Sequence, residues 1–190
     1  MKRMIGILLT IVGIATIGGV IYKKNIVFNR QKELIKVLEE TFNEESEDFS
    51  KEEKLINGYK PIALVEIPSI NLSQGLVEGI TDDILQYYLG HFEISAKPGE
   101  KGNFIVAGHR VSDYSEAFIN LYKVRIGDKV LVKVNKKEYV YEITDSFIVS
   151  PSRVDVLENT DEATITLITC TVGAKNRLIV KGILIEEKNI

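Results

Sequence analysis

The chain has 190 residues, of which 45% are hydrophobic and 27% charged, and a net charge of -3. This composition is typical of one globular domain with an accessory segment, and the slightly acidic balance gives no reason to expect nucleic-acid binding. A single cysteine excludes an internal disulfide and a multi-cysteine metal site, and two histidines leave little for zinc.

An uncharged apolar stretch runs from Met4 to Tyr22. It is about 19 residues long, which is enough for a helix to cross the hydrocarbon core of a bilayer. A secretory signal peptide has a shorter apolar region and a small-residue cleavage site, which is not evident here, so we expect an uncleaved anchor over residues 1–24. A buried core helix is the alternative, but the stretch has no polar face. Basic residues flank both ends, so the positive-inside rule does not fix its orientation.

Residues 25–58 are charged and largely acidic. Leu34, Leu38 and Phe42 recur with helical spacing. We expect a partly helical stalk that becomes a solvated linker, and we interpret it as a spacer rather than a binding element.

Residues 59–190 have the sequence pattern of a β domain, because short runs of β-favouring residues alternate with turn residues. We expect a short helix from Thr81 to Tyr88, another over Ser115–Val124, a loop at Pro98–Gly102 and a hairpin turn at Asn135–Glu138. The predicted strands are Ile62–Ile67, Asn103–Ala107, Lys129–Val134, Tyr139–Val149, Thr164–Thr169 and Arg177–Ile185. Many short strands with few helices favour a mostly β fold, a barrel or sandwich of about 130 residues.

The lone thiol, Cys170, ends the run TLITC. A free cysteine is often a small buried hydrophobe, but outside the cytoplasm it is an oxidation liability. A free thiol is mostly protonated at neutral pH, so nucleophilic use requires an acid/base partner and a stabiliser of the oxyanion.

Two strand-end residues meet those requirements. His109 ends the run NFIVAGHR, where Gly108 permits close approach of another chain, and a histidine can donate a proton to a leaving amine. Arg177 begins the last predicted strand, and an antiparallel pairing through Thr171–Asn176 would bring its guanidinium to the sulfur. The alternatives are a histidine that only hydrogen-bonds a loop and an arginine that is a surface charge.

Together the motifs AGHR, TLITC and an arginine seven positions later resemble the sortase family, the membrane-anchored cysteine transpeptidases of Gram-positive bacteria. The family's Thr-Leu-x-Thr-Cys motif is intact at 166–170, and the resemblance covers Lys60 to Glu186. The stretches GHFEISAKPGEKGNFIVAGHR and YSEAFINLYKVRIGDKV, with the short loop before Arg177, are most similar to class D members.

The resemblance implies a sortase-like β-barrel and a separate catalytic role for each of three residues. Cys170 would attack the Thr–Gly carbonyl of an LPxTG-like sorting signal, His109 would be the general acid/base, and Arg177 would position substrate and stabilise the oxyanion. Thr169 and Thr171 are candidates for the substrate pocket. His91 is expected to make a structural hydrogen bond.

The resemblance also implies partners and location. The substrates would be surface proteins with a C-terminal sorting signal, and the acceptor an amine of a cell-wall precursor. The N-terminus would be cytoplasmic and the catalytic domain extracellular, held at the cell membrane by one span. We expect no cofactor and no required metal.

Three other functions stay open. A cysteine hydrolase would use the same acylation residues and differ only in its acceptor, water. A peptidoglycan L,D-transpeptidase is disfavoured because its Ser-His-Gly-Cys surroundings are absent. A non-enzymatic, membrane-tethered binding module would not need Cys170.

Overall fold

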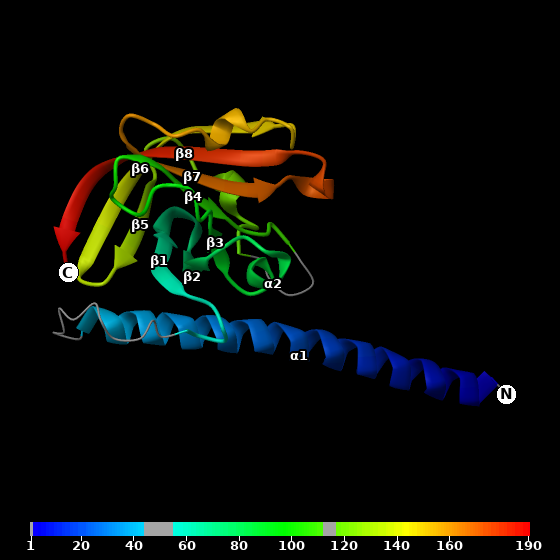
Figure 1. The fold of residues 1–190 in the computed structure, drawn as a ribbon. Helices are drawn as coiled ribbons and strands as arrows, with labels where there is room; N and C mark the ends of the chain where they lie inside the picture. The colour runs from blue at the N-terminus through cyan, green and yellow to red at the C-terminus, as the bar shows by residue number, and fades with distance from the viewer. Residues whose placement is uncertain (1, 44–54, 112–116) are drawn as a thin grey trace.

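The computed structural model describes residues 2–43, 55–111 and 117–190 (Figure 1). One long helix, α1 (Lys2–Asn43), lies along the side of a closed eight-stranded barrel. The strands are β1 (Pro61–Ile67), β2 (Leu72–Glu78), β3 (Leu89–His91), β4 (Gly102–Ala107), β5 (Lys129–Val134), β6 (Lys137–Val149), β7 (Ala163–Cys170) and β8 (Arg177–Asn189). The mostly β prediction is confirmed.

The strand order around the barrel is β1-β2-β3-β4-β7-β8-β6-β5. The pairs β2/β3 and β4/β7 are parallel, and the other neighbouring pairs are antiparallel. Strand β7 therefore has a parallel neighbour on one side and an antiparallel neighbour on the other. Because β4 and β7 are parallel, their carboxyl ends lie at the same end of the barrel, where β8 begins.

Alternating side chains fill the barrel. Phe104 and Val106 of β4 and Ile165 and Leu167 of β7 belong to one buried cluster. Since successive side chains of a strand point to opposite faces, the residues between them face outwards. On that outer side Ile168 packs against a smaller cluster that includes Val156.

The sequence patterns find six strands within one or a few residues of their ends, but not β2 and β3. In β2 the run Ser73-Gln74-Gly75 interrupts any alternation of apolar and polar residues. β3 has three residues, which is too short for a pattern. The predicted hairpin turn is confirmed, since β5 and β6 are joined by Asn135 and Lys136 alone, with Asn135 left-handed at φ 51°.

The short helical segments differ from the prediction. Helix α2 (Asp82–Leu85) ends before Tyr88, and the Thr81 side chain makes no capping hydrogen bond. No helix fills the described part of Ser115–Val124: turns lead into a 3₁₀ turn, η2 (Leu121–Lys123). Tertiary contact decides this, because the Phe118 N–H donates to the His109 carbonyl. The remaining 3₁₀ turns are η1 (Pro68–Ile70), η3 (Asp155–Leu157) and η4 (Val172–Ala174).

The C-terminal part of α1 is packed on the barrel, so the prediction of a spacer was wrong for this part. Leu34 and Leu38 are buried with Leu64, Val77 and Tyr88. Gly75 makes the close approach possible, because a Cβ there would lie 2.3 Å from Leu34 Cδ2. The leucines are four residues apart, so they lie on one side of the helix.

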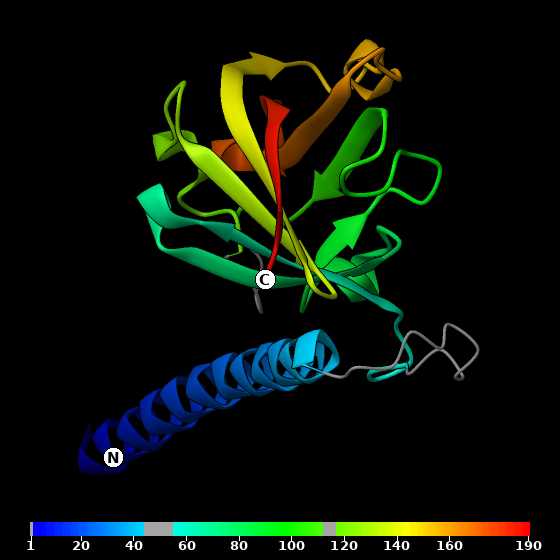
Figure 2. The same cartoon turned by 90° about the vertical axis from the view of Figure 1, so that its left-hand side faces the viewer.

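The N-terminal part of α1 extends beyond the barrel, and its apolar side chains from Met4 to Tyr22 are exposed (Figures 1 and 2). The helix is long and apolar enough to cross a membrane.

Candidate active site

Cys170 lies at the end of β7 on the outer face of the barrel. Ile165 and Leu167 point into the core, so the two-residue period places Cys170 on the opposite face, with Ile168. Cys170 is partly exposed and is the one cysteine of the chain. The sulfur therefore reaches solvent at the rim of the barrel.

Arg177 is the direct partner of Cys170 in the antiparallel β7/β8 ladder. Directly opposed side chains point to the same face, with Cα atoms about 5 Å apart. The predicted antiparallel pairing of the strands that end at Cys170 and begin at Arg177 is therefore confirmed. The guanidinium is held by its own loop, since Nη1 donates to the carbonyls of Ala174 and Asn176, both at 3.3 Å.

His109 approaches from the other side. Ala107, the last residue of β4, is aligned with Ile168 of the parallel strand β7. The Gly108 N–H donates to the Ile168 carbonyl at 3.1 Å, which extends the ladder by one residue. The Thr169 hydroxyl also donates to the Gly108 carbonyl, so the residue before His109 is bonded to the residue before Cys170.

Gly108 has no room for a side chain. A Cβ there would lie 2.6 Å from Leu89 Cδ2 and 2.7 Å from Phe118 Cδ2. Phe118 also donates its N–H to the His109 carbonyl at 3.0 Å. The glycine thus lets Phe118 pack against the chain at the residue before His109 and hold it in place.

The two threonines have structural contacts. Thr169 is 3% exposed and its hydroxyl donates to the Gly108 carbonyl at 2.8 Å, which ties β7 to the segment that carries His109. The Thr171 hydroxyl donates to the Asn176 carbonyl and accepts from the Asn176 N–H, both at 3.2 Å. Thr169 thus joins β7 to the segment before His109, and Thr171 closes the β7–β8 loop.

The loop between β7 and β8 is tightly turned. Gly173 and Ala174 have positive φ angles of 76° and 56°. Ala174 is strained by this conformation, which L residues rarely adopt. Its carbonyl accepts from Arg177, so the strained turn supports the arginine.

His91 is buried and fully engaged. Nδ1 lies 2.6 Å from Glu78 Oε1, and Nε2 lies within 3.1 Å of both Ser95 Oγ and the Ala96 carbonyl. This confirms the expected structural role.

A network that sequence reasoning missed anchors the β6–β7 connection. The Thr166 hydroxyl donates to Asn103 Oδ1 at 2.7 Å, and Asn103 Nδ2 donates to the carbonyls of Val156 and Glu158. Asn159 Oδ1 accepts from the Asn103 N–H at 2.9 Å. The only signal in the sequence was the threonine that begins the motif, Thr166, and a polar residue at the start of a predicted strand, Asn103.

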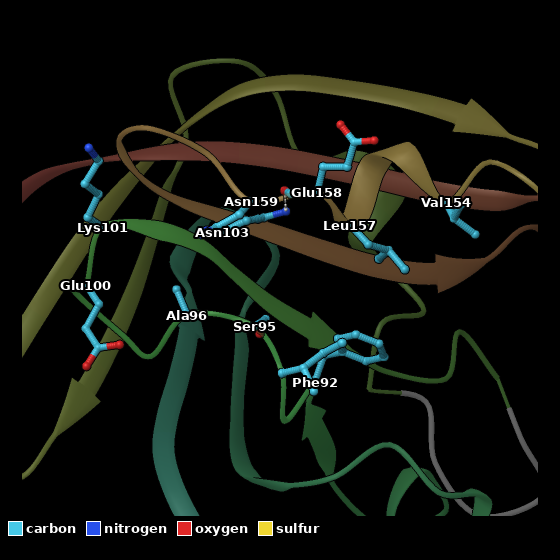
Figure 3. Close-up of a pocket in the computed structure, with 11 residues that line it drawn as sticks. Phe92, Ser95, Ala96, Glu100, Lys101, Asn103, Val154, Leu157, Glu158 and Asn159 are labelled. Atoms are coloured by element: carbon cyan, nitrogen blue, oxygen red, sulfur yellow. Dashed lines mark hydrogen bonds between the residues drawn. The ribbon is translucent and has the colours of Figure 1, made fainter.

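A hollow of about 560 Å³ lies beside this network (Figure 3). Figure 3 shows Phe92 and Leu157 on either side of it, with Asn103 and Asn159 between β4 and the β6–β7 connection. Its lining includes the charged residues Glu100, Lys101 and Glu158 but none of the Cys170, His109 and Arg177 set. The hollow lies at the start of β4, and His109 follows the end of the same strand.

Metal ligands do not gather in the described parts of the chain: within residues 2–43, 55–111 and 117–190 no three His, Cys, Asp or Glu side chains are placed to hold an ion.

The family model of the sortase domain matches residues 65–185, which is most of the chain. The chain belongs to the sortase family. The match covers the barrel from β1 to β8 and includes Cys170, His109 and Arg177.

Individual relatives agree with this membership. The sortase is 38% identical to YwpE of Bacillus subtilis, which is named as a sortase, over 93 residues (48% of this chain, 90% of YwpE). It is 31% identical to sortase A of Bacillus anthracis over 129 residues. This match covers 67% of this chain and 61% of the relative.

A solved structure of the Clostridium perfringens sortase D5 transpeptidase superposes with a TM-score of 0.74 at 40% identity. The superposition covers 83% of this sortase and 99% of that chain. The similarity to class D sortases is confirmed, and by family this sortase is a cysteine transpeptidase.

Proposed function

We propose that Cys170 is the nucleophile of a membrane-anchored transpeptidase acting on an LPxTG-like sorting signal. The observation that carries this proposal is the pairing around Cys170. Arg177 is its partner in the β7/β8 ladder, and the preceding residue, Thr169, bonds to the Gly108 carbonyl next to His109. A cysteine transpeptidase needs one reactive thiol, and the chain has one cysteine.

The reaction follows from these positions. The Cys170 sulfur attacks the carbonyl carbon of the Thr–Gly bond, and the negative charge that develops on the carbonyl oxygen lies within reach of the Arg177 guanidinium. The C–N bond then breaks as His109 gives a proton to the leaving amine, and a thioester remains. An incoming amine attacks the thioester, His109 takes its proton, and the C–S bond breaks to restore the thiolate.

The hollow and Cys170 define a path for the peptide along the outer face of β4 and β7. Asn103 and His109 are six residues apart, which is about 20 Å along a strand. An extended peptide of about six residues has the same length, which is enough for the four motif residues before the scissile Thr–Gly bond. The residues upstream of the scissile bond would then occupy the hollow beside Leu157 and Phe92.

The cellular arrangement is part of the proposal. Residues 4–22 would form a single span in the cell membrane, with a cytoplasmic N-terminus and an extracellular barrel, supported by the exposed apolar helix. Surface proteins with a C-terminal sorting signal would be the substrates, and a cell-wall precursor would supply the amine. Residues 59–190 would form the catalytic domain together with the part of α1 that packs on it.

The test uses the full chain in detergent micelles and an LPxTG-type peptide, with and without an amine acceptor, and identifies products by mass spectrometry. We expect an acceptor-ligated product that is absent with Cys170→Ala. A product that contains only added water, even at high acceptor concentration, would support the hydrolase. Cleavage that survives in Cys170→Ala would refute the nucleophile.

A further inference from the structure

The direction of α1 relative to the barrel is fixed by buried contacts. The Gln31 side chain accepts from the Gly75 N–H at 3.0 Å and donates to the Tyr87 carbonyl. The Arg30 guanidinium lies 4.0 Å from the centre of the Tyr87 ring, and Leu34 is fully buried over Gly75. These contacts satisfy buried polar groups and fill a notch, so the helix is seated in one orientation.

The same helix continues without a break into the apolar segment. It runs from Lys2 to Asn43 as one α-helix, and all four prolines of the chain follow it, from Pro61 onwards. Tyr22 and Arg30 are eight residues apart, or about 12 Å along the axis. The barrel is therefore held close to the end of the apolar segment, with no hinge in between.

The end of the barrel that carries Cys170 points in the direction of that segment. In Figure 1, β7 runs towards the N-terminal side of the molecule, and its connection to β8 is the extremity of the barrel on that side. Figure 2 shows α1 below the barrel, receding from the viewer towards its N-terminus. The connection therefore faces the bilayer side of the barrel when residues 4–22 span the membrane.

The residues at this end suit a lipid surface. The connection Thr171–Asn176 has an apolar residue, Val172, that is 78% exposed, one cation, Lys175, and no acid. On the neighbouring strand, His109 is followed by Arg110 and by Val111, which is 48% exposed. An exposed apolar side chain beside cations is the composition by which surface segments enter an anionic interface.

We propose that the β7–β8 connection is a membrane-contact element that seats the Cys170 end of the barrel on the lipid headgroups, with Val172 entering the interface. This rests on the span of residues 4–22 in the proposed function. The partner is the surface of a bilayer that contains anionic lipid.

The chain has no tryptophan, so single tryptophans report depth without background. Val172→Trp, Val20→Trp and Ile185→Trp are placed in the full chain, reconstituted in phosphatidylglycerol–phosphatidylcholine vesicles with or without brominated acyl chains. Val20 is in the apolar segment, and Ile185, 49% exposed, lies eight residues beyond Arg177 on β8, about 26 Å away.

We expect brominated lipid to quench the emission of Val172→Trp and Val20→Trp but not of Ile185→Trp. The Val172→Trp emission should also shift to shorter wavelength when the protein passes from detergent to vesicles. Quenching at Val20 with equal, unquenched emission at Val172 and Ile185 would overturn the contact and leave the anchor intact. No quenching at Val20 would overturn both the anchor and this inference.

Discussion

The Thr169 hydroxyl donates to the Gly108 carbonyl at 2.8 Å, and thereby joins the residue before Cys170 to the residue before His109. The hydroxyl is on the strand that carries the thiol, and the carbonyl is on the segment that carries the imidazole. At 3% exposure the bond has no competition from bulk water. The relative position of the Cys170 and His109 side chains therefore depends on a hydrogen bond that involves neither of them.

Thr169→Val keeps the shape of this side chain and removes the donor. We expect a loss of about 1–3 kcal/mol in the free energy of unfolding, because the buried Gly108 carbonyl loses its partner. We also expect slower acylation, while Thr169→Ser, which retains the hydroxyl, stays near the parent in both. Urea unfolding and single-turnover acylation measure the two effects. A valine variant as stable and active as the parent would show that the bond does not position His109.

Arg177→Lys keeps a positive charge but loses the planar guanidinium, whose Nη1 donates to the carbonyls of Ala174 and Asn176. We expect transpeptidation to slow by about 10²–10³-fold, the usual cost of removing one oxyanion donor. Turnover of the peptide by full-length protein checks this, with a thermal melt to confirm folding. Near-normal turnover would make Arg177 structural only.

The packed part of α1 predicts a boundary effect on stability. A fragment that begins at Lys54 leaves Leu64, Val77 and Tyr88 without the cover of Leu34 and Leu38. We expect it to be less stable by about 3 kcal/mol than a fragment that begins at Asn25. Thermal melts compare the two, and Leu34→Ala in the longer fragment is the matched control with an intermediate loss. Equal melting temperatures would mean that the helix contributes nothing to the barrel.

Tyr141 predicts an alkaline limit to stability. Burial raises its pKa to about 12, and the Gly99 N–H donates to its oxygen at 2.8 Å. A raised folded-state pKa contributes stability that is complete below the unfolded value near 10 and is lost as the pH rises through about 12. Urea unfolding between pH 9 and about 12 should therefore show a steeper decline for the parent than for Tyr141→Phe. Parallel declines would contradict the assignment.

The sequence predicts most of the barrel because its long strands carry β-rich runs bounded by turn residues. The short strand β3 and the Gly-interrupted β2 escape this reasoning, since their place is set by the neighbours they pair with. Gly75, which breaks the pattern of β2, is also the notch that receives Leu34. Gly75 is thus the reason that β2 is not recognised from the sequence, and it is also the reason that Leu34 of α1 can pack against the barrel.

The chemical core of the candidate site is predictable because it lies at strand ends, where a motif residue and its register partner are close in sequence. Cys170 and Arg177 are joined by six residues, so their antiparallel pairing follows from a short loop. The tasks of Thr169 and Thr171 are not predictable in this way. Their hydroxyls bond to backbone atoms of Gly108 and Asn176, and which backbone atoms approach is decided only by the folded barrel.

Because α1 is unbroken, the number of residues between the apolar segment and Gln31 sets the distance of the barrel from that segment and the rotation of the barrel about the helix axis. In the proposed membrane arrangement, one added turn of helix would lift the thiol about 5.4 Å, while one deleted residue would swing the barrel about 100° around the axis. A flexible tether would tolerate either change. In the proposed arrangement, the number of residues from Tyr22 to Gln31 therefore sets where the Cys170 end of the barrel lies relative to the bilayer.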